Sequence, residues 1–491
     1  MRSKVRIAIV LALTAIVLVP PVARGETAKQ YLDSARSAER GGNYQKAVDD
    51  YSAAIRMGAG EADTYVRRGL AYERLNNNTA AISDYTKAIK IDPHLAMAYN
   101  NRGSVYYRQG RFDAAVEDFN QAIKLSPSRA LAYYNRGNAY YGKGNHDQAI
   151  ADFTRAIELN PEDPDAYNNR GYARLKLNET TESIKDFSRA IELNPSYALA
   201  YYNRGNARLK SGDPDGSIED LTRAVELNPK YALAYFKRGN AYFRTAALDK
   251  AVADYNKAVR IRPNYADVYN NRGWVFFKKG NKALAIRDFS RAIRLSPEHP
   301  RAYVNRGVVH KSSGDCVKAI QDFTKALELD GNQPLVYSQR GECYLHEKHP
   351  AKAAKDLERA VQLKDESKDV LLTLGMLKER SGDYRSAARA FAKLASQNPG
   401  KAEYHFNLGV ALGKQGRFGK ALKELTKAIE LDPKYRQAYL ARGIVSEFLG
   451  NTTGARADFS LALKLKGDRE AGQSLREPVD LSRIQATLAE Q

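Results

Sequence analysis

The chain has little cysteine, tryptophan and histidine. Of its 491 residues, two are Cys, one is Trp and seven are His. The histidines form no His-Glu-x-x-His motif, the cysteines form no Cys-x-x-Cys pair, and the glycines form no Gly-x-x-x-x-Gly-Lys-Ser/Thr phosphate loop. The sequence therefore offers no catalytic or metal-ligating constellation, and we expect neither an enzyme nor a cofactor. Whether Cys316 and Cys343 form a disulfide is left open, because spacing alone does not place two cysteines within bridging distance.

Long apolar runs are also missing, apart from one near the N-terminus. Three basic residues precede an apolar run at 7–19, which two prolines break, and small residues follow at 23 and 25. Thirteen apolar residues fall short of the about 20 needed to span a membrane. The layout predicts a signal peptide at 1–25 and a periplasmic or secreted protein. The alternative is an uncleaved N-terminal membrane anchor.

Basic residues outnumber acidic ones: the chain has 78 Lys and Arg and 57 Asp and Glu, which gives a net charge of +21. The predicted signal peptide carries four basic residues and no acid, so the remainder keeps a charge of +17. This surplus favours anionic partners, either acidic protein segments or an anionic glycan. We do not expect the protein to bind nucleic acid. Only the positive charge favours such binding, and the predicted export argues against it.

The most informative feature present is a glycine that returns every 34 residues. A thirteenth, earlier copy of the same unit has Ala35 at this place. A strict period of this length predicts small helical units that bury a core only by stacking on their neighbours. The glycines are Gly69, Gly103, Gly137, Gly171, Gly205, Gly239, Gly273, Gly307, Gly341, Gly375, Gly409 and Gly443.

Residues 96–129 represent the unit. Apolar residues at helical spacing predict a first helix over 96–109 and a second over about 112–125. Gly110 separates them, and glycine tolerates the left-handed conformation that often ends a helix. Gly103 lies inside the first helix, where glycine costs about 1 kcal/mol relative to alanine. Its recurrence predicts a close approach of the two helices that a Cβ atom would block.

The unit resembles the tetratricopeptide repeat, and the resemblance covers residues 28–469. It implies an all-α, right-handed superhelical solenoid of about 13 helix-turn-helix units, whose first helices line a concave groove that binds other proteins. The matching positions in the unit are Tyr99, Gly103, Tyr106, Gly110, Ala115, Phe119, Ala122 and Pro127.

The units predict the domain organisation. Residues 28–333 form nine regular repeats, 334–401 two divergent ones and 402–469 two further repeats. The divergent region is a hinge, a change of pitch or a dimer contact, and the sequence does not choose among these. The tail at 470–491 is expected to cover the end of the last repeat. Its amphipathic stretch consists of Leu481, Ile484 and Leu488.

An Arg and an Asp recur together in ten copies of the unit, as Arg102 on the first helix and Asp118 on the second. In the copy that starts at Lys368 both are lost, to Leu374 and Ala390. The joint loss predicts a structural ion pair that links the two helices.

An asparagine row on the first helices is the candidate binding site. Helix interiors disfavour asparagine, so its recurrence there needs a reason. A carboxamide both donates and accepts, and can hold a peptide group without reading side chains. The row is similar to the asparagine ladder of O-linked N-acetylglucosamine transferase, which implies that it binds extended peptides. The alternative is that these amides bridge neighbouring helices. The residues are Asn101, Asn135, Asn169, Asn203, Asn271, Asn305 and Asn407.

These observations together predict a non-catalytic protein-interaction scaffold of the bacterial cell envelope. An accessory subunit of an envelope polysaccharide or cell-wall enzyme complex, with basic residues on an anionic glycan, is the alternative. The basic residues that end several first helices, such as Arg74, Arg108 and Lys210, either line the groove or complement the helix dipole.

Overall fold

The computed structural model describes residues 27–465, and this range consists of 26 α-helices without any strand. The all-α prediction is therefore confirmed. The predicted signal peptide (1–25) and the predicted capping tail (470–491) lie outside the described residues. Within the described range, no helix has the length and apolar character needed to cross a bilayer. The chain divides into two compact units, and the boundary in the sequence lies between Ala241 and Tyr242, within helix α13 (Ala232–Arg244).

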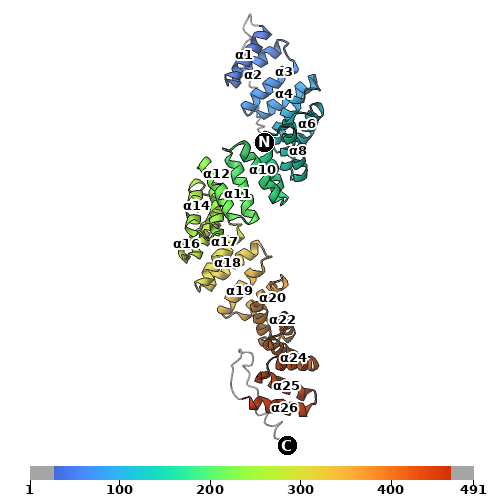
Figure 1. Cartoon of the computed structure of the whole chain (residues 1–491), viewed down its shortest axis with the longest axis vertical. Coiled ribbons are helices and arrows are strands. Elements are labelled where there is room, and N and C mark those ends of the chain that lie inside the picture. Colours follow the sequence, from blue (N-terminus) through green and yellow to red (C-terminus); the bar gives the residue numbers. More distant parts are fainter. Residues whose placement is uncertain (1–26, 466–491) are drawn as a thin grey trace, which may run out of the picture. The chain divides into compact units, whose positions relative to one another are not determined.

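In the first unit, the helices follow one another in chain order, from blue to green in Figure 1. Each is in contact with the next. They are α1 (Ala28–Arg40), α2 (Tyr44–Arg56), α3 (Ala62–Arg74), α4 (Asn78–Ile91), α5 (Ala96–Arg108), α6 (Phe112–Leu125), α7 (Ala130–Gly142), α8 (His146–Leu159), α9 (Pro164–Lys176), α10 (Thr180–Leu193), α11 (Ala198–Ser211) and α12 (Pro214–Leu227).

The second unit repeats this arrangement, and again each helix contacts the next. Its helices are α14 (Leu248–Ile261), α15 (Ala266–Lys278), α16 (Lys282–Leu295), α17 (Pro300–Ser312), α18 (Cys316–Leu329), α19 (Pro334–His346), α20 (Pro350–Gln362), α21 (Lys368–Arg380), α22 (Tyr384–Gln397), α23 (Ala402–Lys414), α24 (Phe418–Leu431), α25 (Arg436–Phe448) and α26 (Thr452–Lys464).

Odd-numbered helices are the first helices of the repeats, and even-numbered helices are the second helices. Within each unit, first helices of consecutive repeats also touch each other, as α5 and α7 or α15 and α17 do. The first helices therefore lie side by side and present equivalent residues along one face, at the helix-to-helix spacing of about 8–10 Å usual for packed helices.

The recurring glycine does allow the close helix approach predicted for it. A Cβ atom added to Gly103 would lie 2.8 Å from Cε1 of Phe119 and 3.2 Å from Cβ of Asp118, on the second helix of the same repeat. Real Cβ atoms do not come so close, because dense packing leaves no room. Gly171 meets Phe187 and Asp186 in the same way.

The turn between the two helices of a repeat uses the left-handed conformation, also as predicted. Gly110 has a φ of 73° and Asn178 one of 65°. Two repeats place other residues there, with φ of 58° at Ala246 and 62° at Lys348. A residue with a Cβ atom is strained in this conformation by about 1–2 kcal/mol.

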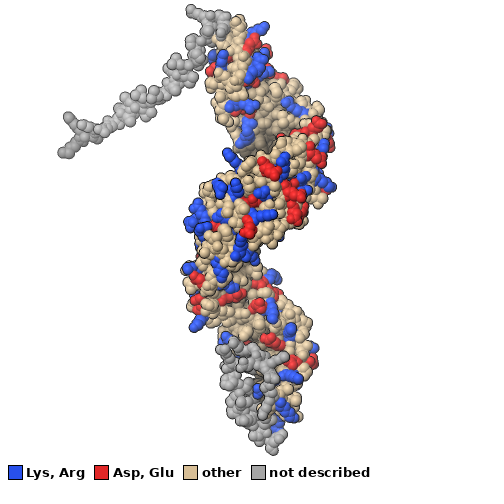
Figure 2. All heavy atoms as spheres, turned by 60° about the vertical axis from the view of Figure 1, so that its left-hand side comes forward, with Lys and Arg blue, Asp and Glu red and all other residues tan. Residues whose placement is uncertain are grey.

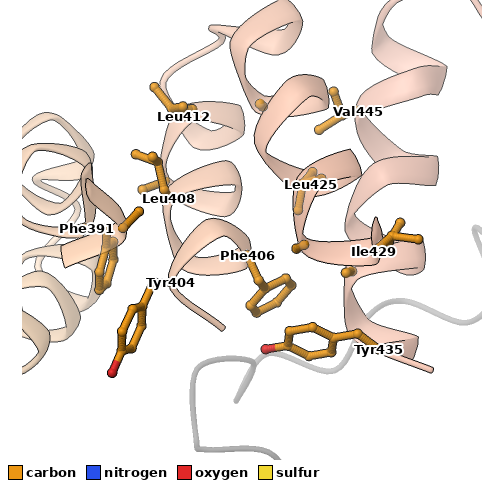
Figure 3. Packing of buried hydrophobic residues seen from close by; sticks show 14 of the residues in the cluster. Phe391, Tyr404, Phe406, Leu408, Leu412, Leu425, Ile429, Tyr435 and Val445 are labelled. Atoms are coloured by element: carbon orange, nitrogen blue, oxygen red, sulfur yellow. The ribbon is translucent and has the colours of Figure 1, made fainter. Parts of the chain in front are cut away.

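The core between the hairpins continues through the divergent region and beyond it. Residues 334–401 form α19–α22 without interruption. Leu374 and Ala390, which replace the Arg and the Asp there, are both buried. Phe391, Leu408 and Leu425 belong to one apolar cluster whose members come from α21 to α26 (Figure 3). Apolar packing thus takes over where the ion pair is missing.

Candidate functional site

The recurring Arg and Asp side chains form the predicted ion pair. In the representative repeat, Arg102 donates from Nε to Oδ2 of Asp118 at 2.8 Å and from Nη2 to Oδ1 at 2.7 Å. The pair is shown in Arg68–Asp84, Arg102–Asp118, Arg136–Asp152, Arg170–Asp186, Arg204–Asp220, Arg272–Asp288, Arg306–Asp322, Arg340–Asp356 and Arg442–Asp458.

The same guanidinium also reaches the preceding repeat, which the sequence did not indicate. Nη1 of Arg102 donates to Oγ1 of Thr86 on α4 at 3.0 Å, and the guanidinium lies 5.8 Å from the ring centroid of Tyr99. The hydrogen bonds that Arg102 donates to Asp118 raise the pKa of Arg102 above its ordinary value. Because its donors are engaged inside the protein, this arginine row holds the array together and is not a ligand site.

The predicted asparagine row lies on the first helices, and its amides link consecutive repeats. Asn135 donates from Nδ2 to Oδ1 of Asn100 at 3.1 Å, and Asn203 donates in the same way to Asn168 at 2.8 Å. Asn169 donates to Oδ1 of Asn138 at 3.0 Å. In the first unit, therefore, amide hydrogen bonds run from α7 to α5, from α9 to α7 and from α11 to α9.

The second unit repeats part of this pattern. Asn305 donates to Oδ1 of Asn270 at 2.9 Å, and Asn270 donates to Oδ1 of its neighbour Asn271 at 3.2 Å. Asn407 is buried, with 5% of its surface exposed. Asn101, in the first unit, accepts from Asn100 at 3.4 Å. All seven predicted residues therefore lie on first helices, and they differ in how far solvent reaches them.

Sequence reasoning missed three partners of this row, Asn100, Asn168 and Asn270. Each directly precedes a predicted ladder residue and is nearly fully buried. The doubled asparagine in these three repeats was the available signal. A buried amide needs hydrogen-bond partners, and each of these finds one in its own repeat and one in the next.

Within this network, some amide oxygen atoms are available to bind a ligand. Nδ2 of Asn135 and of Asn305 points back to the preceding repeat, whereas no hydrogen bond among the described residues ends on their Oδ1 atoms. The amide orientations follow from the network. The amides of Asn135 and Asn305 thus bridge neighbouring repeats through their nitrogen atoms. Their oxygen atoms can accept a hydrogen bond from an N–H group of a ligand.

A second feature is a basic hollow at the start of the first unit. It has a volume of about 700 Å³ and lies between α1, the start of α2 and α3. Four arginines line it with two acids, Asp33 and Glu39. The face drawn in Figure 2 carries side chains of both signs, Lys and Arg in blue and Asp and Glu in red. The arginines of the hollow are Arg36, Arg40, Arg67 and Arg74.

The basic residues that end the first helices differ in their surroundings. Arg108 pairs with Glu73 of the preceding repeat, and Lys210 donates from Nζ to Oδ1 of Asn178 at 2.6 Å. Arg74 lines the basic hollow instead. The hollow thus gathers arginines of α1 and α3 around one open space.

The two cysteines lie together as buried free thiols, and the Sγ atoms of Cys316 and Cys343 are 3.0 Å apart. Burial raises the pKa of the Cys343 thiol to about 12, with a further contribution from Cys316. Cys316, His346 and Glu347 also bring donor atoms within 4.8 Å of one another, a grouping that could hold a metal ion. Sequence reasoning missed this trio because its members come from α18 and from the end of α19.

Known protein families match most of the repeat region. The family described as "TPR repeat" matches residues 69–110, 103–144 and 171–212. Families described as "Tetratricopeptide repeat" match 130–163, 153–185, 202–266, 266–299, 300–333, 369–400 and 402–435. Together these segments cover more than half of the 491 residues.

Curated relatives match over short stretches. Serine/threonine-protein phosphatase 5 of Mus musculus is 32% identical over 99 residues, which is 20% of either chain. The chain thus spans about a fifth of the length of that phosphatase. Tetratricopeptide repeat protein 36 of Homo sapiens is 32% identical over 104 residues, or 20% of this chain and 55% of that protein.

The solved structures match larger shares of this chain than the curated relatives do. A crystal structure of MamA is 26% identical, covers 33% of this chain and 95% of that chain, and has a TM-score of 0.32. A structure of YrrB, described as a TPR protein with an unusual peptide-binding site, is 24% identical, covers 38% of this chain and 95% of that chain, and has a TM-score of 0.34.

Proposed function

Because the chain belongs to the tetratricopeptide repeat family, we propose that it is a non-catalytic scaffold that binds extended peptide or protein partners along its first helices. Tetratricopeptide repeat proteins act as scaffolds for protein interactions, and most of the described residues form such repeats. The observation that carries the proposal is the amide row, which places one equivalent side chain on successive first helices.

The geometry of this row suits an extended peptide. Packed helices lie about 8–10 Å apart, and an extended chain advances about 3.3 Å per residue. One amide per repeat would therefore meet about every third residue of a bound peptide. Because the N–H groups of Asn135 and Asn305 bind the preceding repeat, these amides would accept hydrogen bonds from the N–H groups of the peptide backbone through their Oδ1 atoms.

We propose the cell envelope as the place of this function. Support comes from the basic residues, the apolar run at 7–19 and the small residues at 23 and 25, which have the layout of a signal peptide. In that compartment the scaffold would assemble a complex of exported proteins.

The basic hollow favours an anionic ligand as a second candidate function. Four arginines around one space of about 700 Å³ suit carboxylate or phosphate groups, which the planar guanidinium binds in pairs of hydrogen bonds. An acidic protein segment or an anionic glycan would fit. In the second case the chain would be an accessory subunit of an envelope polysaccharide or cell-wall enzyme complex.

The test is quantitative capture of partners from an extract of the native cell envelope. The immobilised wild type is compared with the double variant Asn101→Ala, Asn135→Ala. The matched control is Gln121→Ala, which removes an exposed amide from the second helix α6. If the row binds peptides, the double variant retains partners roughly five- to 150-fold less well, since each of the two lost hydrogen bonds contributes about 0.5–1.5 kcal/mol.

Retention of the same partners by the double variant would refute the amide row as the binding site. The second candidate has its own signature. Binding through the hollow falls steeply with salt, because exposed charges are screened within about 8 Å at physiological ionic strength. It also falls with Arg40→Ala plus Arg74→Ala and not with the asparagine variants.

A further inference from the structure

The first helices of the last two repeats line an apolar pocket of about 490 Å³. Val410 of α23 and Ile444 of α25 contribute to its walls, together with Leu440. Phe418 and Phe448 stack at one side, with ring centroids 4.9 Å apart and planes inclined by 2°. Phe448 is 56% exposed although it is large and apolar.

This pocket occupies the face that carries the amide row elsewhere. Counting in steps of 34 residues, Ala441 takes the place of Asn101, and Leu440 that of Asn100. In the last repeat, apolar residues thus replace the polar strip of the first unit, while Asn407 keeps the amide on α23 and is buried there. Leaving such a surface in water costs about 25 cal/mol per Å², so an apolar occupant is favoured.

We propose that the segment 478–491 of this chain occupies the pocket as an amphipathic helix. Leu481, Ile484 and Leu488 recur at the spacing of one helix face. The structure describes the chain as far as Leu465, only 16 residues before Leu481. A stretch of that length spans up to about 53 Å, while α25 is about 20 Å long, so the segment reaches the pocket easily.

Charge agrees with this assignment. Lys414 is the one charged residue among those that line the pocket. The segment carries two acids, Asp480 and Glu490, against one base, Arg483. The inference does not depend on the proposed function, because it concerns a contact within the chain.

The competing place for the segment is the outer side of α26, where Leu461 and Leu463 are 43% and 44% exposed. An experiment must therefore separate the two surfaces. Hydrogen exchange of the full chain does so, because a covered helix exchanges more slowly than an exposed one.

The full chain is compared with the variant Ile484→Asp, Leu488→Asp. The matched control is Ala486→Asp, which adds one negative charge to the opposite face of the segment. We expect residues 440–448 to exchange at least tenfold faster in the double variant and unchanged in the control. Phe448→Lys should have the same effect, while Leu449→Lys, its exposed neighbour outside the pocket lining, should have none.

Two results would overturn the proposal. One is unchanged exchange of 440–448 in the double variant, which would leave the pocket to another protein. The other is faster exchange confined to α26, reproduced by Leu461→Lys, which would place the segment on the last helix.

Discussion

At the scale of single residues, the arginine that most first helices carry determines how neighbouring repeats are joined. It binds an Asp of its own repeat through two nitrogens and a hydroxyl or amide of the preceding repeat through the third, as Arg306 does with Asp322 and Ser290. Side chains in this row are largely buried. A buried pair of this kind is costly to break, although an apolar pair can replace it.

The repeat that begins at Lys368 suggests the test, because it has the apolar residues Leu374 and Ala390 in place of the Arg and the Asp. We expect Arg306→Leu alone to lower the free energy of unfolding by about 3–5 kcal/mol, since it leaves Asp322 buried and unpaired. Adding Asp322→Ala should recover most of that loss. Urea denaturation measures both, with Lys325→Ala in the exposed pair with Glu328 as a control that costs at most about 1 kcal/mol. A double variant no more stable than Arg306→Leu would contradict the account.

A second residue-scale prediction concerns Lys348, which holds the left-handed turn position with a φ of 62°. Lys348→Gly should raise the free energy of unfolding by about 0.5–1 kcal/mol, because relief of strain exceeds the entropy that glycine adds to the unfolded chain. Lys355→Gly, on the exposed face of α20, should instead lower it by about 1 kcal/mol. Equal destabilisation by both changes would show that the turn carries no strain.

Sequence reasoning succeeded and failed at this scale for identifiable reasons. The pair of Arg102 with Asp118 was predictable because both residues disappear together at Leu374 and Ala390. The link from Arg102 to Thr86 was not, because Ser, Thr and Asn are common on exposed helix faces. The buried Asn100 was overlooked beside Asn101, since only packed neighbours decide which of two adjacent amides is enclosed.

At the scale of helices, the recurring glycine determines how closely the two helices of a repeat can pack. The predicted bounds were nearly right, since the helix expected over 96–109 runs from Ala96 to Arg108 and the one expected over 112–125 from Phe112 to Leu125. The strict period made this possible. The apolar pocket in the last two repeats was not predicted, because three helices contribute to it and no single repeat reveals it.

Two glycines of one repeat offer a matched test of helix packing. A Cβ atom at Gly409 would lie 2.6 Å from Cγ of Leu425, whereas one at Gly419 would meet nothing within 4 Å. We expect Gly409→Ala to lower the free energy of unfolding by about 1–3 kcal/mol through overpacking, despite its gain in helix propensity. Gly419→Ala should raise it by up to about 1 kcal/mol. Thermal or urea unfolding measures both, and stabilisation by Gly409→Ala would show that the helices can separate freely.

At the scale of the whole molecule, the two units share one construction principle and differ in their polar surfaces. Stability in such arrays comes mainly from contacts between adjacent repeats. Function therefore depends on what each stretch of first helices presents. The first unit presents the basic hollow and a run of linked amides, and the end of the second presents an apolar pocket. Period and composition could predict the array, while these surfaces depend on side chains from neighbouring repeats.

The central claim is that the first helices form the binding face. Hydrogen exchange of the full chain, with and without a partner captured from the envelope extract, tests it most directly. The account predicts slower exchange in the first helices α5, α7, α9 and α11, and loss of that protection in the variant Asn101→Ala, Asn135→Ala. Protection confined to the second helices α6, α8, α10 and α12, or protection that survives the variant, would contradict it.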